Sequence, residues 1–201
     1  MVSDPSLADS KQSALAKFGF NANDFSQEWV VLPMGGGTTL DDPSLDLCNG
    51  AYPSEKERAE RRQVAATKPG STFSFLSTET VKYSSVAAAQ AAQRELVRAV
   101  AQCHIDKGFK DTTGALVSYA FSEIKNPPNG LVTDGSRVLV RAQIDTGVRA
   151  RQLLGFYQFN GDTFTGLYVM RVSETGFTDA QVSNWLQVAV TMANRLKSKT
   201  P

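Results

Sequence analysis

The chain contains 201 residues, of which 41% are hydrophobic and 20% charged, a composition typical of a globular protein rather than a disordered or membrane one. Lysine and arginine number 21 against 20 acidic residues. The net charge of +1 argues against binding to nucleic acid or anionic lipid through a general positive field. No apolar run approaches the roughly 20 residues that span a bilayer. At this length a single domain can bury roughly 70% of the surface of the unfolded chain.

The first segments of the chain predict a tail, a short strand and a loop. Residues 1–13 are polar and aperiodic, which predicts a tail or linker in front of a single domain, 14–201. Residues 29–32 form a short apolar run that Pro33 ends, as expected for a strand. The glycines at 35–37 follow this strand. No Gly-Lys-Ser/Thr sequence comes after them, so a surface loop is favoured over a phosphate-binding loop.

A charged helix is expected next. Ser54 and Glu57 have the spacing of a capping box, in which each side chain accepts a hydrogen bond from the backbone amide of the other residue. This pattern predicts a helix from about Glu55 to Thr67. Its densely charged first half suits i,i+4 ion pairs on a solvent-exposed face.

The rest of the chain alternates between strand-like and helix-like patterns. A strand at 72–83 precedes a helix at 85–103, and the C-terminal helix begins after Thr178, which has the capping-box spacing with Gln181. Four strand-like runs lie between these helices, at 115–125, 137–145, 152–159 and 163–172. Asn160-Gly161 predicts a type I′ turn between the last two, and such short links make neighbouring strands antiparallel. The sequence therefore predicts an α+β fold, an antiparallel meander of about five strands with helices packed on it.

The sequence offers little for catalysis. His104 is the only histidine, and it cannot form a dyad with Cys103 because adjacent helical residues point about 100° apart. Neighbouring carboxylates such as Asp41 and Asp42 are expected in a loop rather than as an acid–base pair. Cys48 and Cys103 are the only cysteines, too few soft ligands for a zinc site, and they are either free thiols or joined. We therefore expect no enzyme activity, no cofactor and no metal.

One pattern indicates a ligand site. Strand parity groups aromatic and apolar side chains with arginines and amides on one face of the predicted sheet: Tyr119, Phe121, Arg141, Gln143, Phe156, Gln158, Val169 and Arg171. An apolar wall with a few such polar groups is typical of a cleft for a small anionic ligand. The alternative is a sheet face half covered by helices, with the arginines reaching water along their apolar stems. The cross-strand register that decides between these interpretations cannot be read from the sequence.

Five segments carry a resemblance to a known family: Leu45-Asp-Leu-Cys48, Tyr52-Pro-Ser-Glu55, Arg61-Arg-Gln-Val64, Thr78-Glu-Thr-Val-Lys-Tyr83 and the alanine-rich stretch that ends at Cys103. They resemble actinobacterial secreted proteins and lipoproteins. More loosely, they are similar to the extracellular sensor domain of mycobacterial receptor serine/threonine kinases. The resemblance covers roughly residues 25–196.

The resemblance implies an exported α+β domain with a central antiparallel sheet, a cleft and no enzymatic activity. It also implies a disulfide between Cys48 and Cys103, although the kinase domains carry a second disulfide that a chain with two cysteines cannot form. We therefore expect an extracytoplasmic, sensor-like module, either secreted or anchored to the membrane through a segment in front of residue 1. Its partner is expected to be a small ligand or a protein of the cell envelope, and not nucleic acid.

Overall fold

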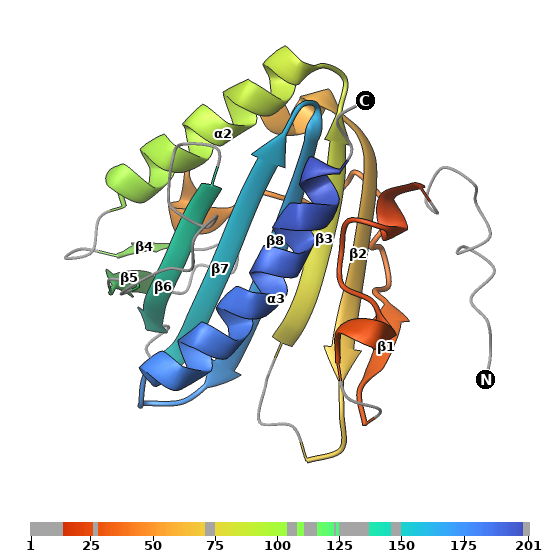
Figure 1. Cartoon of the computed structure of the whole chain (residues 1–201). Coiled ribbons are helices and arrows are strands. Elements are labelled where there is room, and N and C mark those ends of the chain that lie inside the picture. The colour runs from red at the N-terminus through yellow and green to blue at the C-terminus, as the bar shows by residue number, and fades with distance from the viewer. Residues whose placement is uncertain are drawn as a thin grey trace.

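The computed structural model describes residues 14–25, 28–70, 75–103, 108–110, 116–122, 124, 137–145 and 150–198. Its main feature is an antiparallel sheet with the strand order β1-β2-β3-β8-β7-β6-β5-β4 (Figure 1). The strands are β1 (Val30–Pro33), β2 (Arg58–Thr67), β3 (Phe75–Tyr83), β4 (Phe109–Lys110), β5 (Leu116–Phe121), β6 (Arg137–Asp145), β7 (Ala150–Asn160) and β8 (Thr163–Val172). The helices are α2 (Val86–Ala101) and α3 (Asp179–Lys197), with the short 3-10 helices η2 (Ala22–Asp24), η3 (Leu47–Asn49) and η4 (Pro53–Glu57). The predicted tail and His104 lie outside the described residues.

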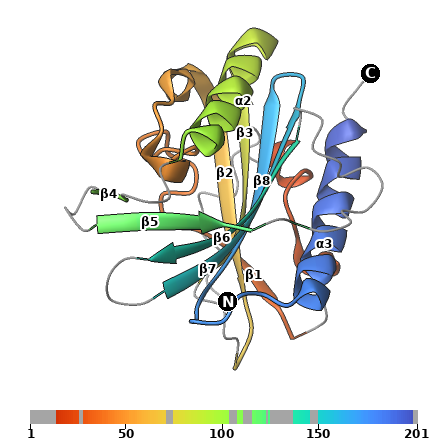
Figure 2. The same cartoon turned by 90° about the vertical axis from the view of Figure 1, so that its left-hand side faces the viewer.

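The sheet consists of two meanders that meet at their last strands. Strands β1 to β3 form one and strands β4 to β8 form the other, and β3 pairs with β8. Figures 1 and 2 show α2 and α3 on opposite faces of this sheet. Each helix buries apolar residues against its own side, Ala92 and Leu96 from α2 and Leu186 and Ala189 from α3. We call the two sides the α2 face and the α3 face.

The prediction of an α+β meander of about five strands is wrong, because an eight-stranded sheet dominates the structure. The largest error concerns residues 55–67, which form the end of η4 and then β2 instead of a helix. The predicted capping box does not form, because the Ser54 amide and hydroxyl both donate hydrogen bonds to the Glu95 carboxylate of α2, at 3.1 and 2.5 Å. The Glu57 carbonyl accepts a hydrogen bond from the Ser84 amide at 2.8 Å. Tertiary partners therefore override the local helix signal.

Strand β2 shows how a charged segment becomes an inner strand. Its backbone pairs with β1 on one side and with β3 on the other. Its side chains alternate, so that Arg61 lies on the α2 face while Val64 enters the core under α3. Glu60 does not form an ion pair along a helix. It lies opposite Lys82 of the neighbouring strand β3, with its carboxylate 3.8 Å from the ammonium group.

The predicted C-terminal helix and the last hairpin are confirmed. The Gln181 amide donates to the Thr178 hydroxyl at 3.3 Å, and the Thr178 amide donates to the Gln181 side chain at 2.9 Å. Asn160 pairs with Thr163, which leaves Gly161 and its neighbour as the two turn residues. Of these two only Gly161 has a positive φ, 59°, as in a type II′ turn rather than the predicted type I′ turn.

Candidate functional site

The strand register places the predicted ligand residues on both faces of the sheet. Tyr119 and Phe121 of β5 lie opposite Ile144 and Ala142 of β6, on the α2 face. The remaining predicted residues lie on the α3 face: Arg141, Gln143, Phe156, Gln158, Val169 and Arg171. The two groups are therefore separated by the thickness of the sheet.

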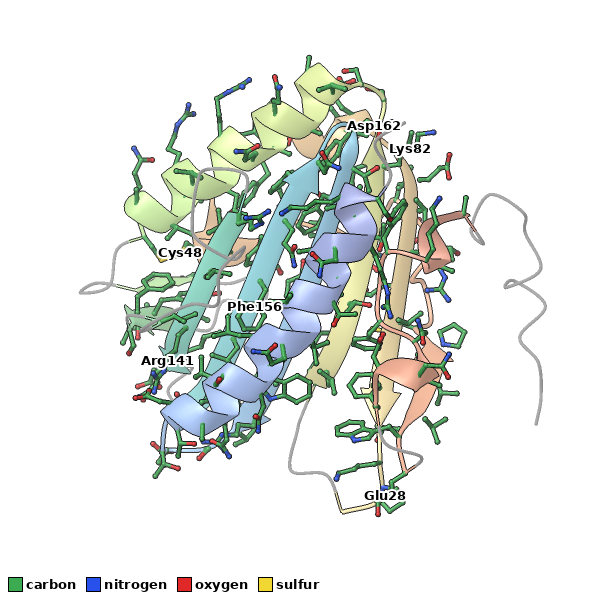
Figure 3. All side chains as sticks on the ribbon, in the orientation of Figure 1. Glu28, Cys48, Lys82, Arg141, Phe156 and Asp162 are labelled. Atoms are coloured by element: carbon green, nitrogen blue, oxygen red, sulfur yellow. A yellow bond between two sulfur atoms is a disulfide. The ribbon has the colours of Figure 1, made fainter. Side chains whose placement is uncertain are left out.

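The α3-face group contacts α3 and the segment that leads into it. Arg141 lies at the start of α3 (Figure 3), where it binds Asp179 Oδ1 at 3.0 Å. Arg171 donates hydrogen bonds to two carbonyls of the loop before α3, at 3.0 and 2.6 Å. Gln158 donates to the Ala189 carbonyl at 3.0 Å. Much of the hydrogen-bonding capacity of this group is thus used in holding α3.

The α2 face contains a cavity of about 210 Å³, which we call the α2-face cavity. The segment 43–47 forms one side of it and the sheet forms the other. Its aromatic and apolar lining comprises Tyr119, Tyr157, Tyr168, Pro43, Leu47, Phe75, Ile144, Leu153 and Met170. Polar groups come from Ser44, Asp46, Arg61, Gln63 and Glu79. Of the predicted ligand residues, Tyr119 lines this cavity.

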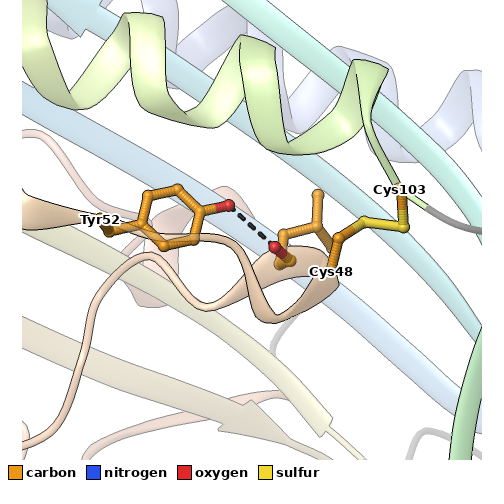
Figure 4. The surroundings of a disulfide bond; sticks show 4 residues. Cys48, Tyr52 and Cys103 are labelled. Carbon is orange, nitrogen blue, oxygen red and sulfur yellow. Dashed lines mark hydrogen bonds between the residues drawn. A yellow bond between two sulfur atoms is a disulfide. The ribbon is translucent and has the colours of Figure 1, made fainter. Parts of the chain in front are cut away.

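A disulfide holds the segment that borders the cavity. Cys48 and Cys103 are bonded, with Cα atoms 5.4 Å apart, beside the C-terminal end of α2 (Figure 4). This is the pairing that the family resemblance implies. Cys48 and Asn49 have φ values of 60° and 50°, a left-handed conformation that residues other than glycine adopt at a cost of about 1 kcal/mol or more. The surrounding contacts therefore keep this segment in an unfavourable backbone shape.

One further contact holds the same segment together, and another places it against α2. The Tyr52 hydroxyl donates a hydrogen bond to the Leu47 carbonyl at 2.9 Å (Figure 4). Gly50 approaches α2 so closely that an added Cβ would lie 2.6 Å from the Cβ of Ala99. A larger residue at position 50 would therefore push the segment away from the helix.

A buried ion pair forms a wall of the α2-face cavity. The side chains of Arg61 and Glu79 are 5% and 3% exposed, and Arg61 Nε donates to Glu79 Oε1. The same oxygen accepts a hydrogen bond from the Ser44 hydroxyl at 2.6 Å. The other two guanidinium nitrogens donate to the Gly36 carbonyl at 3.0 Å and to the Gln63 side chain at 2.8 Å. All three nitrogens of the guanidinium group are thus engaged.

The glycine-rich segment at 35–37 packs against β2. The Gly37 carbonyl accepts a hydrogen bond from the Gln63 amide at 2.8 Å. An added Cβ on Gly37 would lie 2.7 Å from the Gln63 carbonyl oxygen, so only glycine allows this approach. Backbone groups of Gly36 and Gly37 bind Arg61 and Gln63, which gives these two glycines a structural explanation.

Two glycines make room for tyrosine rings beside the cavity. The rings of Tyr157 and Tyr168 fold over Gly155 and Gly166 of their own strands, where an added Cβ would collide with them. The two rings meet edge to face with centroids 5.5 Å apart. The Tyr168 hydroxyl is buried and has no hydrogen-bond partner among the described residues. The Tyr168 hydroxyl is thus a buried polar group beside the cavity whose hydrogen-bonding capacity is not used within the described part of the chain.

Burial determines the protonation state of the tyrosines that line the cavity. It raises the pKa of Tyr119 to about 12 and the pKa values of Tyr157 and Tyr168 well above the ordinary tyrosine value. The Asp46 carboxylate adds to all three shifts, so it lies within electrostatic reach of the three hydroxyls. Asp46 keeps contact with solvent, yet the protein atoms around it and the nearby Glu79 raise its own pKa. The tyrosines are therefore neutral at neutral pH.

We expect Asp46 to make stability depend on pH. A carboxyl whose pKa is higher in the folded than in the unfolded state disfavours folding when it is ionised, and this penalty disappears as the pH falls through the folded pKa. The Asp46→Asn variant should therefore be more stable than the wild type at pH 7 and should lose this advantage toward about pH 4. Urea unfolding across this range measures the difference. A difference that is the same at every pH would contradict the expectation.

Most residues of this cavity carry no sequence pattern that predicts a common site. Asp46, Arg61 and Glu79 lie far apart in the chain and have no common spacing, so no motif connects them. All three nevertheless lie in segments that carry the family resemblance. That overlap is the one sequence signal for the cavity. The arginines and glutamines predicted to bind a ligand lie on the α3 face instead.

The described residues also bear on membrane and metal binding. Among the described helices, none has both the length and the apolar character needed to cross a membrane. Within the same ranges, no group of three or more His, Cys, Asp or Glu side chains could hold a metal ion.

Comparison with known proteins connects this architecture with an extracellular domain. No protein-family model and no curated protein sequence matches the chain. A solved structure with a similar fold is the extracellular domain of PknH from Mycobacterium tuberculosis, with a TM-score of 0.61 at 10% sequence identity. The match covers 94% of this chain and 97% of that chain. The resemblance to mycobacterial sensor domains is therefore confirmed at the level of the fold.

Proposed function

We propose that this chain is a non-catalytic, extracytoplasmic domain of the cell envelope that binds a small molecule in the α2-face cavity. The observation that carries the proposal is the cavity itself, about 210 Å³ in volume. Its lining of aromatic and apolar side chains with a few polar groups is the usual composition of a ligand site. A sensor-like role is supported by the likeness in fold to an extracellular domain.

Two features support the extracytoplasmic location. Cys48 and Cys103 form a disulfide, and disulfides persist in oxidising compartments but are rare in the cytosol. The likeness in fold to an extracellular domain covers nearly the whole chain, 94% of it. Both features agree with an exported module.

The polar groups of the cavity suit binding better than catalysis. Glu79 is held by Arg61 and Ser44, so its carboxylate is not free to act as a base. The raised pKa of Tyr119 keeps its hydroxyl protonated at neutral pH. Both cysteines of the chain are in the disulfide and provide no nucleophile.

Intact mass of protein purified without reductant tests the proposal. We expect the chain to lack two hydrogens, and native spectra to show an additional mass that denaturing conditions release. The Met170→Trp variant should lose this mass because the larger side chain fills the cavity. Val172→Trp is the matched control, since Val172 points to the same face two residues further along β8 but is 43% exposed and does not line the cavity.

Three outcomes would contradict parts of the proposal. A bare, oxidised chain would remove the small-molecule ligand and keep the location. Retention of the additional mass by Met170→Trp would place the ligand outside the cavity. Two free thiols in protein from an oxidising host compartment would remove the argument for export.

A second candidate function is an interaction module that holds a protein of the envelope. Strand β1 favours it, because Val30 and Leu32 are each 50% exposed and point to the same side of this strand. β1 is at one end of the strand order, so its outer edge pairs with no strand in the described part of the chain. Such an edge can pair with a strand of another protein. A bare, oxidised chain in the mass measurement would favour this candidate.

A further inference from the structure

The charges around the α2-face cavity indicate the sign of its ligand. Arg61 is the one arginine or lysine that lines the cavity among the described residues. Its side chain is 5% exposed, and all three guanidinium nitrogens already donate hydrogen bonds, to Glu79, Gly36 and Gln63, so Arg61 offers little to an anion. Glu79 is in turn neutralised by Arg61. The charge left for a ligand is the Asp46 carboxylate, which contacts solvent.

Tyrosine rings surround the cavity and complement this charge. Tyr119, Tyr157 and Tyr168 all line it, and the face of an aromatic ring attracts a cation within about 6 Å of its centre. Tyr157 and Tyr168 are nearly perpendicular, with an angle of 70° between their planes, so their faces point in different directions.

We propose that the α2-face cavity binds a small organic cation, a protonated amine. Its ammonium group pairs with the Asp46 carboxylate, and its hydrocarbon part lies among the tyrosine rings and the side chains of Leu153 and Met170. This inference rests on the proposed function, because it names the class of ligand for the same cavity.

An anion fits the cavity poorly. It would approach the Asp46 carboxylate with no free cation nearby to compensate that charge, and like charges in a partly desolvated site repel strongly. The buried tyrosines, whose pKa values are raised, stay neutral and add no charge that could repel the ammonium group. A cation is therefore attracted by the Asp46 carboxylate and by the tyrosine rings, whereas an anion is repelled by Asp46.

Three probes of nearly equal shape separate charge from size: benzylamine, benzyl alcohol and benzoate. At pH 7 the first is a cation, the second is neutral and the third is an anion. Titration of the full chain by calorimetry or by NMR should show benzylammonium binding at least about tenfold more tightly than benzyl alcohol, because the ammonium group adds an ion pair with Asp46 to the hydrogen bond that a hydroxyl can also make. Benzoate should bind most weakly.

Variants assign the effect to one carboxylate. Asp46→Asn should weaken benzylammonium binding by about tenfold to a hundredfold and should affect benzyl alcohol binding much less, because the amide oxygen of asparagine can still accept a hydrogen bond. Asp41→Asn is the matched control, because Asp41 is exposed on the same loop and does not line the cavity; it should change neither affinity. Met170→Trp should abolish binding of all three probes.

The outcomes distinguish failure of the cation inference from failure of the proposed ligand-binding function. If benzyl alcohol or benzoate binds as tightly as benzylammonium, and Met170→Trp blocks that binding, the cation inference is overturned while the ligand cavity stands. Equal benzylammonium binding by wild type and Asp46→Asn would overturn it as well. If none of the probes binds and native spectra show a bare chain, both the inference and the ligand-binding function are overturned.

Discussion

Replacing Glu79 with glutamine should lower the free energy of unfolding by about 3–5 kcal/mol, the typical cost of leaving one charge of a buried pair without its partner. Glu79 is 2% exposed on the inner strand β3, where its carboxylate accepts hydrogen bonds from Arg61 and Ser44. Glutamine preserves the shape but carries no charge, so the guanidinium group of Arg61 stays buried without compensation. Urea unfolding monitored by circular dichroism measures the loss.

Glu60→Gln is the matched control for this prediction. Glu60 lies on the neighbouring strand β2 and pairs with Lys82 at 3.8 Å, where the two side chains are 27% and 42% exposed. Exposed pairs of this kind contribute about 0.2–1 kcal/mol, so the control should be several times milder than Glu79→Gln. The double variant Arg61→Met/Glu79→Leu should be less destabilised than the sum of its single variants, since it leaves no unpaired charge. Equal effects of Glu79→Gln and Glu60→Gln would contradict this account of the ion pair.

The sequence predicts those elements whose signals are local. The capping box of Thr178 and Gln181 and the turn at Gly161 involve residues within three positions of each other, and both occur in the structure. Strand β2 depends instead on partners from elsewhere in the chain. Ser54 binds Glu95, 41 residues away, and the β2 backbone pairs with both β1 and β3. A window of charged residues with helical spacing cannot reveal these partners.

The candidate site was less predictable than the fold. Parity places Arg141 and Gln143 on one face of β6, and they do share it. Parity within one strand carries no information about the next, however, so Tyr119 of β5 lies on the opposite face from these residues. The α2-face cavity depends further on segment 43–47, whose position follows from tertiary contacts rather than from a periodic pattern.

Removal of the disulfide should have the second large effect. The bond closes a loop with a sequence separation of 55 residues, and the chain-entropy model gives about 4 kcal/mol for a loop of this length. For a chain of this size, such a loss corresponds to a decrease in melting temperature of roughly 8–16 °C. The double variant Cys48→Ser/Cys103→Ser should therefore melt at a lower temperature than the oxidised wild type, and the wild type in strong reductant should melt near the double variant.

The same change should weaken ligand binding, because the segment that borders the cavity is kept in a left-handed conformation at Cys48 and Asn49. Without the bond this segment can relax, and Asp46 and Leu47 would leave their positions beside the cavity. Titration of benzylammonium into the double variant, well below its melting temperature, measures this effect. The double variant with added reductant controls for effects of the reductant itself. Equal melting temperatures for the oxidised and reduced wild type would contradict the stability prediction. A lower melting temperature with unchanged affinity would show that the disulfide stabilises the fold without shaping the cavity.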